Sequence, residues 1–586
     1  MASSISGKAF DLSLFKRVMR YVGPYRTVFI LTSVLTIVLA VLSPIRPLLI
    51  QYAVDNFIVI PDPSNLFRIT ILMIILLILE AIFQFLQAYL ANWIGQSVIR
   101  DIRVQVFQKI TGFRLRFIDQ TPLGTLVTRV ISDIETIADI FSQGVLIIIG
   151  DILKLIVVII FMFVTDWKLA LFSMAPVPVL LVATNIFKNY IKRAFQDVRT
   201  AVAELNTFVQ EHLTGMIIVK AFAKERREYK RFTDINKRHR DAHIRTVWAN
   251  SIFFPVVEIL SAVSIALLVW WGAGEVLKEH TTVGSLMAFI LYIYMLYRPI
   301  RQLADRFNIL QMGMVSSERV FKLIDKDENI KQYGATRISR LKGEINFKDV
   351  WFAYSNEDWI LKNINFNVEA GSTIAFVGST GAGKTTIINL IGRFYEFQKG
   401  QISIDNADIR SYQRTDLRTA IGIVLQDVFL FSDTIFNNIT LGDASITLET
   451  VRNAAKKVGA DKFINRLPGG YDFNVGERGG MLSSGQRQLI AFIRAYVYNP
   501  SVLILDEATS SIDSETERLI QQAIDVLTEN RTALIIAHRL ATVKKADKII
   551  VLDKGEIIEE GSHSELIKLE GAYQKLFELQ FDGDLS

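Results

Sequence analysis

The first half of the chain is dominated by long apolar runs separated by polar, basic stretches. A helix that crosses the hydrocarbon core of a bilayer needs about 20 mostly apolar residues. Six runs approach or exceed that length, and only residues 165–168 separate the third from the fourth, which predicts a tight helical hairpin. Buried helices of a soluble protein are the alternative, but six such runs in half a chain favour membrane spans. The expected spans are residues 28–50, 69–94, 145–164, 169–186, 248–273 and 283–297.

The second half has a different pattern, with short apolar runs between polar and glycine-containing segments. Residues 345–354 alternate apolar and polar positions, as a half-buried strand does. Residues 372–377, 502–505 and 532–537 are apolar runs of strand length, and residues 487–498 have a helical pattern. The fold class we expect is an α-helical six-span membrane domain (1–320), a polar linker (321–344) and an α/β domain (345–586).

The placement of Lys and Arg predicts the orientation of the spans. The loops after the second and fourth runs are rich in basic residues, whereas the alternate loops offer little more than Arg68, Lys168 and Lys278. Because basic loops stay in the cytoplasm, the N-terminus, these two loops and the α/β domain are expected there. The first run lacks a small-residue cleavage site and is too long for a signal peptide, so we expect it to be retained. The basic loop residues include Arg100, Arg103, Lys109, Arg114, Arg116, Arg129, Lys188, Lys192, Arg193, Arg199, Lys220 and Lys224.

The two basic loops are far longer than a hairpin requires and contain few Pro or Gly. They are therefore expected to be helical extensions of the spans into the cytoplasm. Each pair of extensions needs a turn, and Gly is where a helix most easily stops. The candidate turns are Leu123-Gly124-Thr125 and Thr214-Gly215-Met216.

Composition supports the membrane interpretation. Hydrophobic residues make up 51% of the chain and charged residues 21%, and the mean hydropathy is +0.31. The net charge of +6 would suit nucleic acid or an anionic lipid surface, and the apolar content favours lipid, so no nucleic-acid partner is expected. The chain has no cysteine, which excludes disulfides, thiolate metal sites and a cysteine protease module.

Ionisable residues inside the expected spans are Glu80, Asp151, Lys154 and Glu258. Such residues are costly in a membrane and mark function by default. For Asp151 and Lys154 a structural role competes equally, because residues three apart on a helix can neutralise each other.

Three arginines, Arg298, Arg301 and Arg306, follow the sixth run around Pro299, where a helix can kink. They would either line a cavity suited to amphiphiles with anionic groups, such as lipids, or face lipid headgroups and form stabilising salt bridges.

The clearest chemical motif begins where the 372–377 strand ends. A predicted strand, a G-x-x-x-x-G-K-[ST] loop and a predicted helix form the context of a phosphate-binding loop. Its glycines let backbone N–H groups surround phosphate oxygens, and the helix N-terminus adds a positive dipole end. Lys384 would neutralise the outer phosphates of ATP, and the Thr385 hydroxyl would ligate Mg²⁺. The loop comprises Gly378, Ser379, Thr380, Gly381, Ala382, Gly383, Lys384 and Thr385, followed by Thr386.

Polar residues also follow the other two apolar strands. Asp506 suits the Mg²⁺ shell and Glu507 suits a general base, although an acidic pair also caps helices. His538 follows residues 532–537, at the strand end where α/β sheets bind ligands. Residues 482–486 (LSSGQ) precede a predicted helix and provide either a second anion site or only a helix cap.

The ordered set of segments closely resembles the ATP-binding-cassette (ABC) transporters, specifically exporters of the type IV fold with the permease fused to the ATPase, over essentially the whole chain. Residues 378–385 match the Walker A motif and residues 502–506 match Walker B. Residues 482–486 match the signature motif, and 510–513 match the D-loop. Residues 475–479 resemble the exporter-type loop that touches the membrane domain, and 121–133 and 211–222 resemble the intracellular coupling regions.

The resemblance implies a role for each matching residue. Glu507, His538, Lys384 and Gln426 would be catalytic, and Thr385, Gln426 and Asp506 would hold Mg²⁺. Tyr354 would stack on adenine, and Ser483 and Gly485 would reach the γ-phosphate of ATP. Ser484 replaces the first glycine of the family's usual LSGGQ, which adds a Cβ there. The ATP-binding set is Tyr354, Gly378, Ser379, Thr380, Gly381, Ala382, Gly383, Lys384, Thr385, Thr386, Ser483, Gly485 and Gln486.

The resemblance also implies a partner and a function. One chain carries one Walker A and one signature motif, whereas family members pair them head to tail, so the chain resembles a half-transporter ATPase. Intact catalytic positions, including Glu507 and His538, favour a homodimer over a heterodimer. The expected function is ATP-driven export of lipids, drugs or other amphiphiles across a bacterial inner membrane. An importer with the exporter fold and an ATP-gated channel or regulator are the alternatives. A soluble P-loop enzyme with a membrane anchor would need one span instead of six.

Overall fold

The computed structural model describes residues 12–328, 334–338, 340–355, 357–506, 514–537 and 540–581. The chain forms two compact units. The first, here called the membrane unit, holds Met1–Thr111 and Leu123–Asp327. The second, the ATPase unit, holds Gly112–Pro122 and Glu328–Ser586, so a short segment from the first half of the sequence groups with the second. The predicted linker at 321–344 overlaps the end of a long helix, which reaches Ile324.

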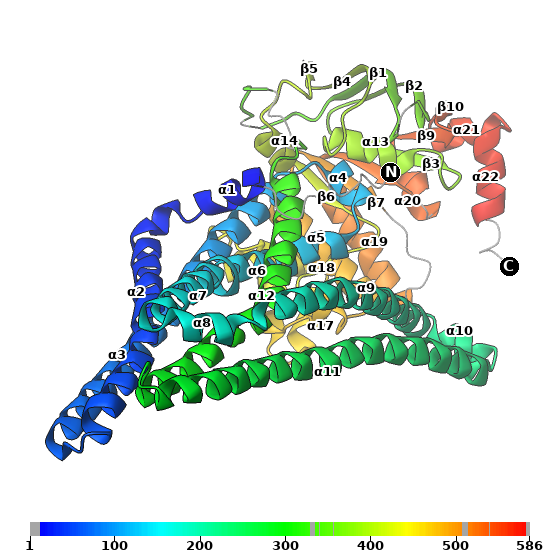
Figure 1. The fold of residues 1–586 in the computed structure, drawn as a ribbon. Helices are drawn as coiled ribbons and strands as arrows, with labels where there is room; N and C mark the ends of the chain where they lie inside the picture. Colours follow the sequence, from blue (N-terminus) through cyan, green and yellow to red (C-terminus); the bar gives the residue numbers. More distant parts are fainter. Residues whose placement is uncertain are drawn as a thin grey trace. The chain divides into compact units, whose positions relative to one another are not determined.

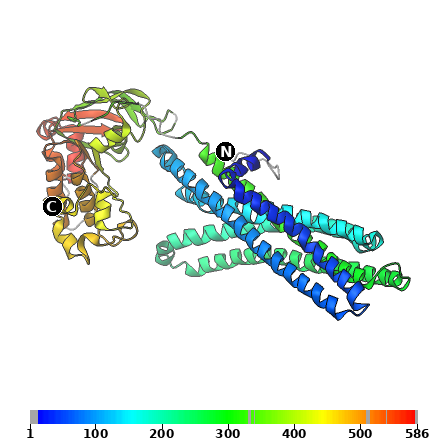
Figure 2. The same cartoon turned by 90° about the vertical axis from the view of Figure 1, so that its left-hand side faces the viewer.

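The membrane unit is built from helices alone, as far as the structure describes it. Helices α9 and α11 run side by side in both views (Figures 1 and 2). Its helices are α1 (Leu12–Arg20), α2 (Arg26–Ala53), α3 (Pro63–Thr111), α5 (Leu123–Val130), α6 (Ser132–Asp139), α7 (Leu146–Thr165), α8 (Trp167–Met174), α9 (Val177–Thr214), α10 (Met216–Ala221), α11 (Glu225–Leu277) and α12 (Val283–Ile324), with short segments η1 (Gly23–Tyr25), η2 (Val54–Ile58) and η3 (Ile140–Val145).

Among the described residues, six helical stretches are long and apolar enough to cross a membrane. Each contains one of the six runs read from the sequence, so the six-span prediction is confirmed. Many of their large apolar side chains are exposed on the helices, including Phe85 (68%) and Trp270 (76%), a surface that suits lipid rather than water. The six stretches are Gly23–Ile58, Pro63–Thr111, Leu123–Thr165, Trp167–Thr214, Glu225–Leu277 and Val283–Ile300.

Local chemistry accounts for two of the turns between helices. In the predicted hairpin at 165–168, the Asp166 carboxylate accepts hydrogen bonds from the backbone N–H groups of Lys168 and Leu169, at 2.9 and 3.1 Å. It thereby caps α8 and fixes the change of direction. At the second predicted cytoplasmic turn, Gly215 separates α9 from α10, as expected.

The first predicted cytoplasmic turn is wrong. Gly124 lies within the first turn of α5, and the chain instead changes direction at residues 112–114 and 121–122. Pro122 explains the difference, because proline restricts the preceding residue to extended backbone and so separates α4 (Leu115–Gln120) from α5. A glycine in the first turn of a helix costs little, because that turn is not yet fully hydrogen-bonded.

The ATPase unit contains a four-stranded sheet, in the order β2-β1-β4-β5, and a six-stranded sheet, in the order β10-β9-β3-β8-β7-β6. The second sheet has a parallel core, with β3 paired to β8 and β9, and β7 paired to β6 and β8. The α/β prediction is therefore confirmed. The strands are β1 (Ile345–Phe352), β2 (Leu361–Val368), β3 (Thr373–Gly378), β4 (Lys399–Ile404), β5 (Ala407–Asp408), β6 (Ile421–Val424), β7 (Val502–Asp506), β8 (Thr532–Ile536), β9 (Lys548–Asp553) and β10 (Glu556–Gly561).

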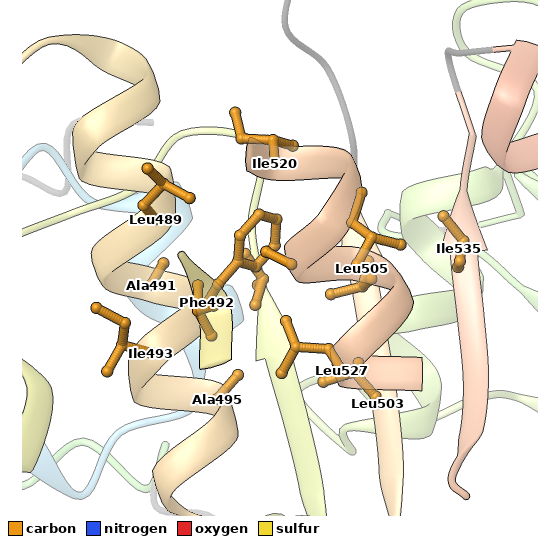
Figure 3. Packing of buried hydrophobic residues seen from close by; sticks show 14 of the residues in the cluster. Leu489, Ala491, Phe492, Ile493, Ala495, Leu503, Leu505, Ile520, Leu527 and Ile535 are labelled. Carbon is orange, nitrogen blue, oxygen red and sulfur yellow. The ribbon is translucent and has the colours of Figure 1, made fainter. Parts of the chain in front are cut away.

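Alternation along the central strands divides the core of this unit between two faces of the six-stranded sheet. In β3, Ala375 and Val377 face one cluster, and Ile374 and Phe376 face the other. The first cluster also holds α18 and α19, and in Figure 3 Phe492 points from α18 toward α19. The helices are α13 (Lys384–Ile391), α14 (Arg414–Ala420), α15 (Ile435–Thr440), α16 (Leu448–Val458), α17 (Asp461–Arg466), α18 (Ser484–Val497), α19 (Ser514–Thr528), α20 (Leu540–Lys545), α21 (His563–Lys568) and α22 (Ala572–Phe581), with short segments η4 (Gly470–Asp472) and η5 (Glu477–Gly479).

Helix α4 belongs to the ATPase unit although its sequence lies between two spans. Leu115 packs against the second core cluster, and the Arg114 N–H donates to the Glu328 carbonyl at 3.0 Å. The Tyr395 hydroxyl donates to the Asp119 carboxylate. Burial and this carboxylate together raise the pKa of Tyr395. The segment grouped with the ATPase unit, 112–122, thus precedes most of the coupling region expected at 121–133.

Candidate functional site

The predicted phosphate-binding loop connects β3 to α13, as its sequence context required. Three of its glycines have positive φ: Gly378 (+149°), Gly381 (+85°) and Gly383 (+104°). A Cβ on Gly378 would stand 2.1 Å from the Leu552 carbonyl oxygen of the neighbouring strand. The tight loop therefore depends on glycine at this position, and its backbone is free to turn N–H groups toward one centre.

Lys384 is the first residue of α13 and is only 8% exposed. Its ammonium donates to the carbonyl oxygens of Gly378 and Ser379, at 2.7 and 2.9 Å, so the side chain folds back over its own loop. Burial lowers the pKa of Lys384, and the nearby charge of Asp506 opposes this effect. A cation held over a ring of backbone groups at a helix N-terminus is suited to phosphate oxygens.

Asp506 ends β7 at the carboxyl edge of the sheet. Strand register places it beside Ile536 of β8, which in turn pairs with Phe376 of β3 just before the loop. Asp506 is 7% exposed, and burial raises its pKa, with a further increase from Asp427 and an opposing decrease from Lys384. The sheet therefore brings the carboxylate and the loop lysine together from residues more than a hundred positions apart.

Gln426 lies two residues beyond β6, the strand that pairs with β7. Its side chain is exposed, and the parallel register of β6 with β7, which pairs Val424 with Leu505, brings this loop to the edge of the sheet where Asp506 lies. Thr385 is also exposed, whereas Thr386 is buried. An accessible hydroxyl, an amide oxygen and a carboxylate are hard oxygen donors, so this set fits Mg²⁺.

Tyr354 lies just beyond β1 and close to α13. Its hydroxyl is 3.2 Å from the Thr386 hydroxyl, and the Asn389 amide donates to it at 3.4 Å. Its ring packs edge-on against Phe352 and Tyr395, with centroids 4.8 and 4.9 Å away. The aromatic ring is thus fixed beside the helix that follows the phosphate loop, and its role in stacking on adenine stays a prediction.

The LSSGQ segment forms the start of α18. Ser483 is the N-cap: its hydroxyl accepts the Gln486 N–H at 3.2 Å, and its own N–H donates to the Gln486 side chain at 3.0 Å. The helix-cap interpretation is therefore correct for these two side chains. Ser484 is helical and does not have a positive φ, so its Cβ causes no backbone strain. Gly485 is buried in the same turn.

Several predicted residues lie outside the described part of the chain. These are Glu507, His538 and residues 510–513. Glu507 directly follows Asp506, the last residue of β7, and His538 follows Ala537, which lies one residue beyond β8. Their roles stay predictions.

Sequence reasoning missed Arg46. It lies inside the first apolar run, between Pro44 and Pro47, and it borders a charged cavity in the membrane unit together with Glu80 and Lys154. An arginine within a spanning segment was the signal that should have identified it. Asn389 and Asp427 were also missed, because neither stands at a position that a motif specifies.

Comparison with known proteins gives matches over both units. Residues 29–300 match the family model for the ABC transporter transmembrane region, and residues 361–510 match the ABC transporter family model. An uncharacterized ABC transporter ATP-binding protein of Bacillus subtilis is 38% identical over 99% of this chain and 96% of its own length. An ATP-dependent lipid A-core flippase of Syntrophus aciditrophicus is 35% identical over 98% of this chain and 95% of its own length. A Staphylococcus aureus protein named as a candidate multidrug export ATP-binding/permease protein is 38% identical over 97% of this chain and all of its own length.

Three findings support one family assignment: the six spans, the phosphate loop at the sheet edge and the full-length relatives. The chain is a multi-pass membrane protein that binds ATP and couples its hydrolysis to transport, and it belongs to the ABC transporter family, in the exporter branch that joins permease and ATPase in one chain.

Proposed function

We propose that two copies of this chain form a homodimer that exports lipids, drugs or related amphiphiles by alternating access. One structural observation supports the dimer most directly. Helix α13, which follows the phosphate loop, packs in the core cluster on one face of the six-stranded sheet, whereas α18, which follows Ser483, packs in the cluster on the other face. A nucleotide on the phosphate loop therefore needs its second half, the Ser483–Gly485 turn, from another copy.

The residues divide the work of hydrolysis among them. Lys384 and His538 stabilise the γ-phosphate, Glu507 orients the attacking water, and Gln426 links the nucleotide to the membrane unit. Tyr354 supports the adenine, and Ser483 and Gly485 of the second copy close over the γ-phosphate. This chemistry is mainly positioning and electrostatic stabilisation. Mg²⁺, held by Thr385, Gln426 and Asp506, would supply charge neutralisation of the phosphates.

Membrane location and direction belong to the same proposal. The basic residues after the second and fourth spans support a cytoplasmic N-terminus and a cytoplasmic ATPase unit, on the side of the membrane where ATP is available. Relatives named for lipid flipping and multidrug export support amphiphiles as cargo and outward movement. Intact Walker A and Walker B motifs and intact catalytic positions, including Glu507 and His538, favour a pump over an ATP-gated channel.

The test is purified full-length protein reconstituted in vesicles with outward-facing ATPase units. We expect a complex with the mass of two chains and accumulation of a fluorescent amphiphile inside the vesicles that requires ATP hydrolysis. A fully active monomer would overturn the dimer. Movement only down a gradient would indicate a channel, and ATP-driven movement toward the ATPase side would indicate an importer.

A further inference from the structure

The membrane unit has an open cavity of about 610 Å³ between helices α2, α3, α7 and α12. Charged side chains gather around it although it lies among the spans. Burying charged side chains among membrane spans costs free energy, so a cluster of them indicates a ligand-binding site or a substrate pathway. Four lining side chains are basic and two are acidic, a surplus of two positive charges: Arg46, Lys154, Arg298 and Arg306 against Glu80 and Asp151.

Only part of this charge is neutralised inside the unit. Asp151 and Arg306 form an ion pair, with 3.2 Å between Oδ2 and Nε. This pair corrects the sequence-based alternative, in which Asp151 would neutralise Lys154. Lys154 and Arg298 make no hydrogen bond and no ion pair within 4.0 Å to any residue that the structure describes, which leaves two cations directed at the same space.

Glu80 is the opposite case, a buried carboxylate with weak partners. It is 6% exposed, yet its nearest cation, the Arg46 guanidinium, is 4.0 Å away, and the Gln84 amide is 3.5 Å away. Both distances are at the limit of a useful interaction. Glu80, Lys154 and Arg298 all line this one cavity, from α3, α7 and α12 respectively. A buried carboxylate that its own protein barely satisfies has capacity to accept a donor from a ligand.

We infer that this cavity binds an amphiphile whose headgroup carries both a phosphate and a primary amine. The phosphate lies between Lys154 and Arg298, and the ammonium donates to Glu80. A purely anionic headgroup would meet the Glu80 carboxylate, and a purely cationic one would meet the surplus of positive charge. A headgroup with both groups satisfies all three side chains at once. The inference rests on the proposed transport of amphiphiles and names the chemistry that selects them.

Binding without nucleotide tests the site separately from transport. The probes are short-chain phosphatidylethanolamine, phosphatidylglycerol and phosphatidylcholine, together with dodecylamine, titrated into the full-length protein and followed by microscale thermophoresis. We expect phosphatidylethanolamine to bind about tenfold more tightly than each of the other three, because only it pairs a phosphate with an amine N–H donor. Tighter binding of phosphatidylglycerol or of dodecylamine would overturn the inference.

Two variants identify the groups responsible. Glu80→Gln should remove the preference for phosphatidylethanolamine over phosphatidylglycerol. Lys154→Gln should weaken the binding of these two phospholipids about tenfold but leave the binding of dodecylamine unchanged. The matched control is Glu258→Gln, a carboxylate in a span that does not line the cavity. Glu80→Asp, which keeps the charge, should retain the preference, so a general loss of folding in Glu80→Gln is distinguished from loss of the carboxylate. An unchanged preference in Glu80→Gln would overturn the role of Glu80.

A last comparison separates a lipid from a soluble metabolite. O-phosphoethanolamine has the same phosphate and amine but no acyl chains. It should compete for the site at least about a hundredfold more weakly than short-chain phosphatidylethanolamine does. Equal competition would overturn the assignment to an amphiphile. ATP-driven flux measured on the same preparations tests the proposed function independently: absent flux with selective binding rejects export, and flux without selective binding rejects this site.

Discussion

The two units of this protein assemble their charged sites in opposite ways. In the ATPase unit, most of the phosphate site comes from one contiguous stretch, Gly378–Thr386, and the sheet adds Asp506 from a neighbouring strand. In the membrane unit, no motif marks the cavity, and its six charged residues come from four helices, with at most two from any one helix. A phosphate site can be local because consecutive backbone N–H groups do much of the binding. A cavity in a helix bundle cannot be local, because each helix presents only one face to it.

The variant with the largest expected effect tests whether ATP hydrolysis depends on residues of the ATPase unit alone. Glu507→Gln should lower steady-state phosphate release at least about 100-fold, the usual contribution of a positioned base, while ATP still binds. Phosphate release and labelled-ATP binding measure the two effects, and the exposed Glu529→Gln is the control. Near-normal turnover would reject Glu507 as the base. Unaltered amphiphile binding in the variant would strengthen the separation between the units.

The core of the ATPase unit should be similarly self-contained. Phe492 is 1% exposed between α18 and α19 (Figure 3), and Phe492→Ala should cost about 3–5 kcal/mol of unfolding free energy through lost burial and the cavity left behind. Leu569→Ala, at a side chain that is 64% exposed, should cost less than about 0.5 kcal/mol. Thermal unfolding of the full chain checks both variants. A Phe492→Ala protein as stable as wild type would mean that the observed packing carries little energy.

A pair of loop glycines separates steric clash from backbone strain. Gly378→Ala should cost about 3 kcal/mol, since its Cβ would meet the Leu552 carbonyl in addition to the unfavourable φ. Gly381→Ala has the unfavourable φ but nothing within 4 Å, so it should cost about 1 kcal/mol. Denaturant unfolding measures the difference. Equal costs would show that the neighbouring strand does not constrain the loop.

In the membrane unit, two ion pairs of Asp151 can be compared: the one with Lys154 that the sequence suggests and the one with Arg306 in the structure. In double-mutant cycles, Asp151→Asn should couple to Arg306→Gln by about 1 kcal/mol, a modest value because both side chains are about one-fifth exposed. Coupling of Asp151→Asn to Lys154→Gln should be smaller. The readout is thermal unfolding in nanodiscs. Stronger coupling to Lys154 would restore the pairing that helical spacing alone suggested.

The smallest effect concerns the departure from the usual signature motif. Ser484→Gly should change the ATPase rate by less than about twofold, because Ser484 is already helical and Ser483 keeps its capping box. Steady-state ATPase assays check this prediction, with Ser483→Ala as the contrasting variant that removes the cap hydroxyl. A large gain in Ser484→Gly would show that the extra Cβ hinders closure of the composite site.

Much of this protein was determined by the sequence alone. Span length and strand alternation are local properties, so six membrane helices and an α/β unit could be predicted, and the spacing of Gly378, Gly383 and Lys384 specified a phosphate loop. Local patterns failed where partners are distant in sequence. Only the tertiary structure decided that Asp151 pairs with Arg306 rather than with Lys154, that Arg46 borders the cavity, and that α4 belongs to the ATPase unit. The physical reason is that charge pairing and cavity lining depend on which helix faces meet, and helix packing sets those faces.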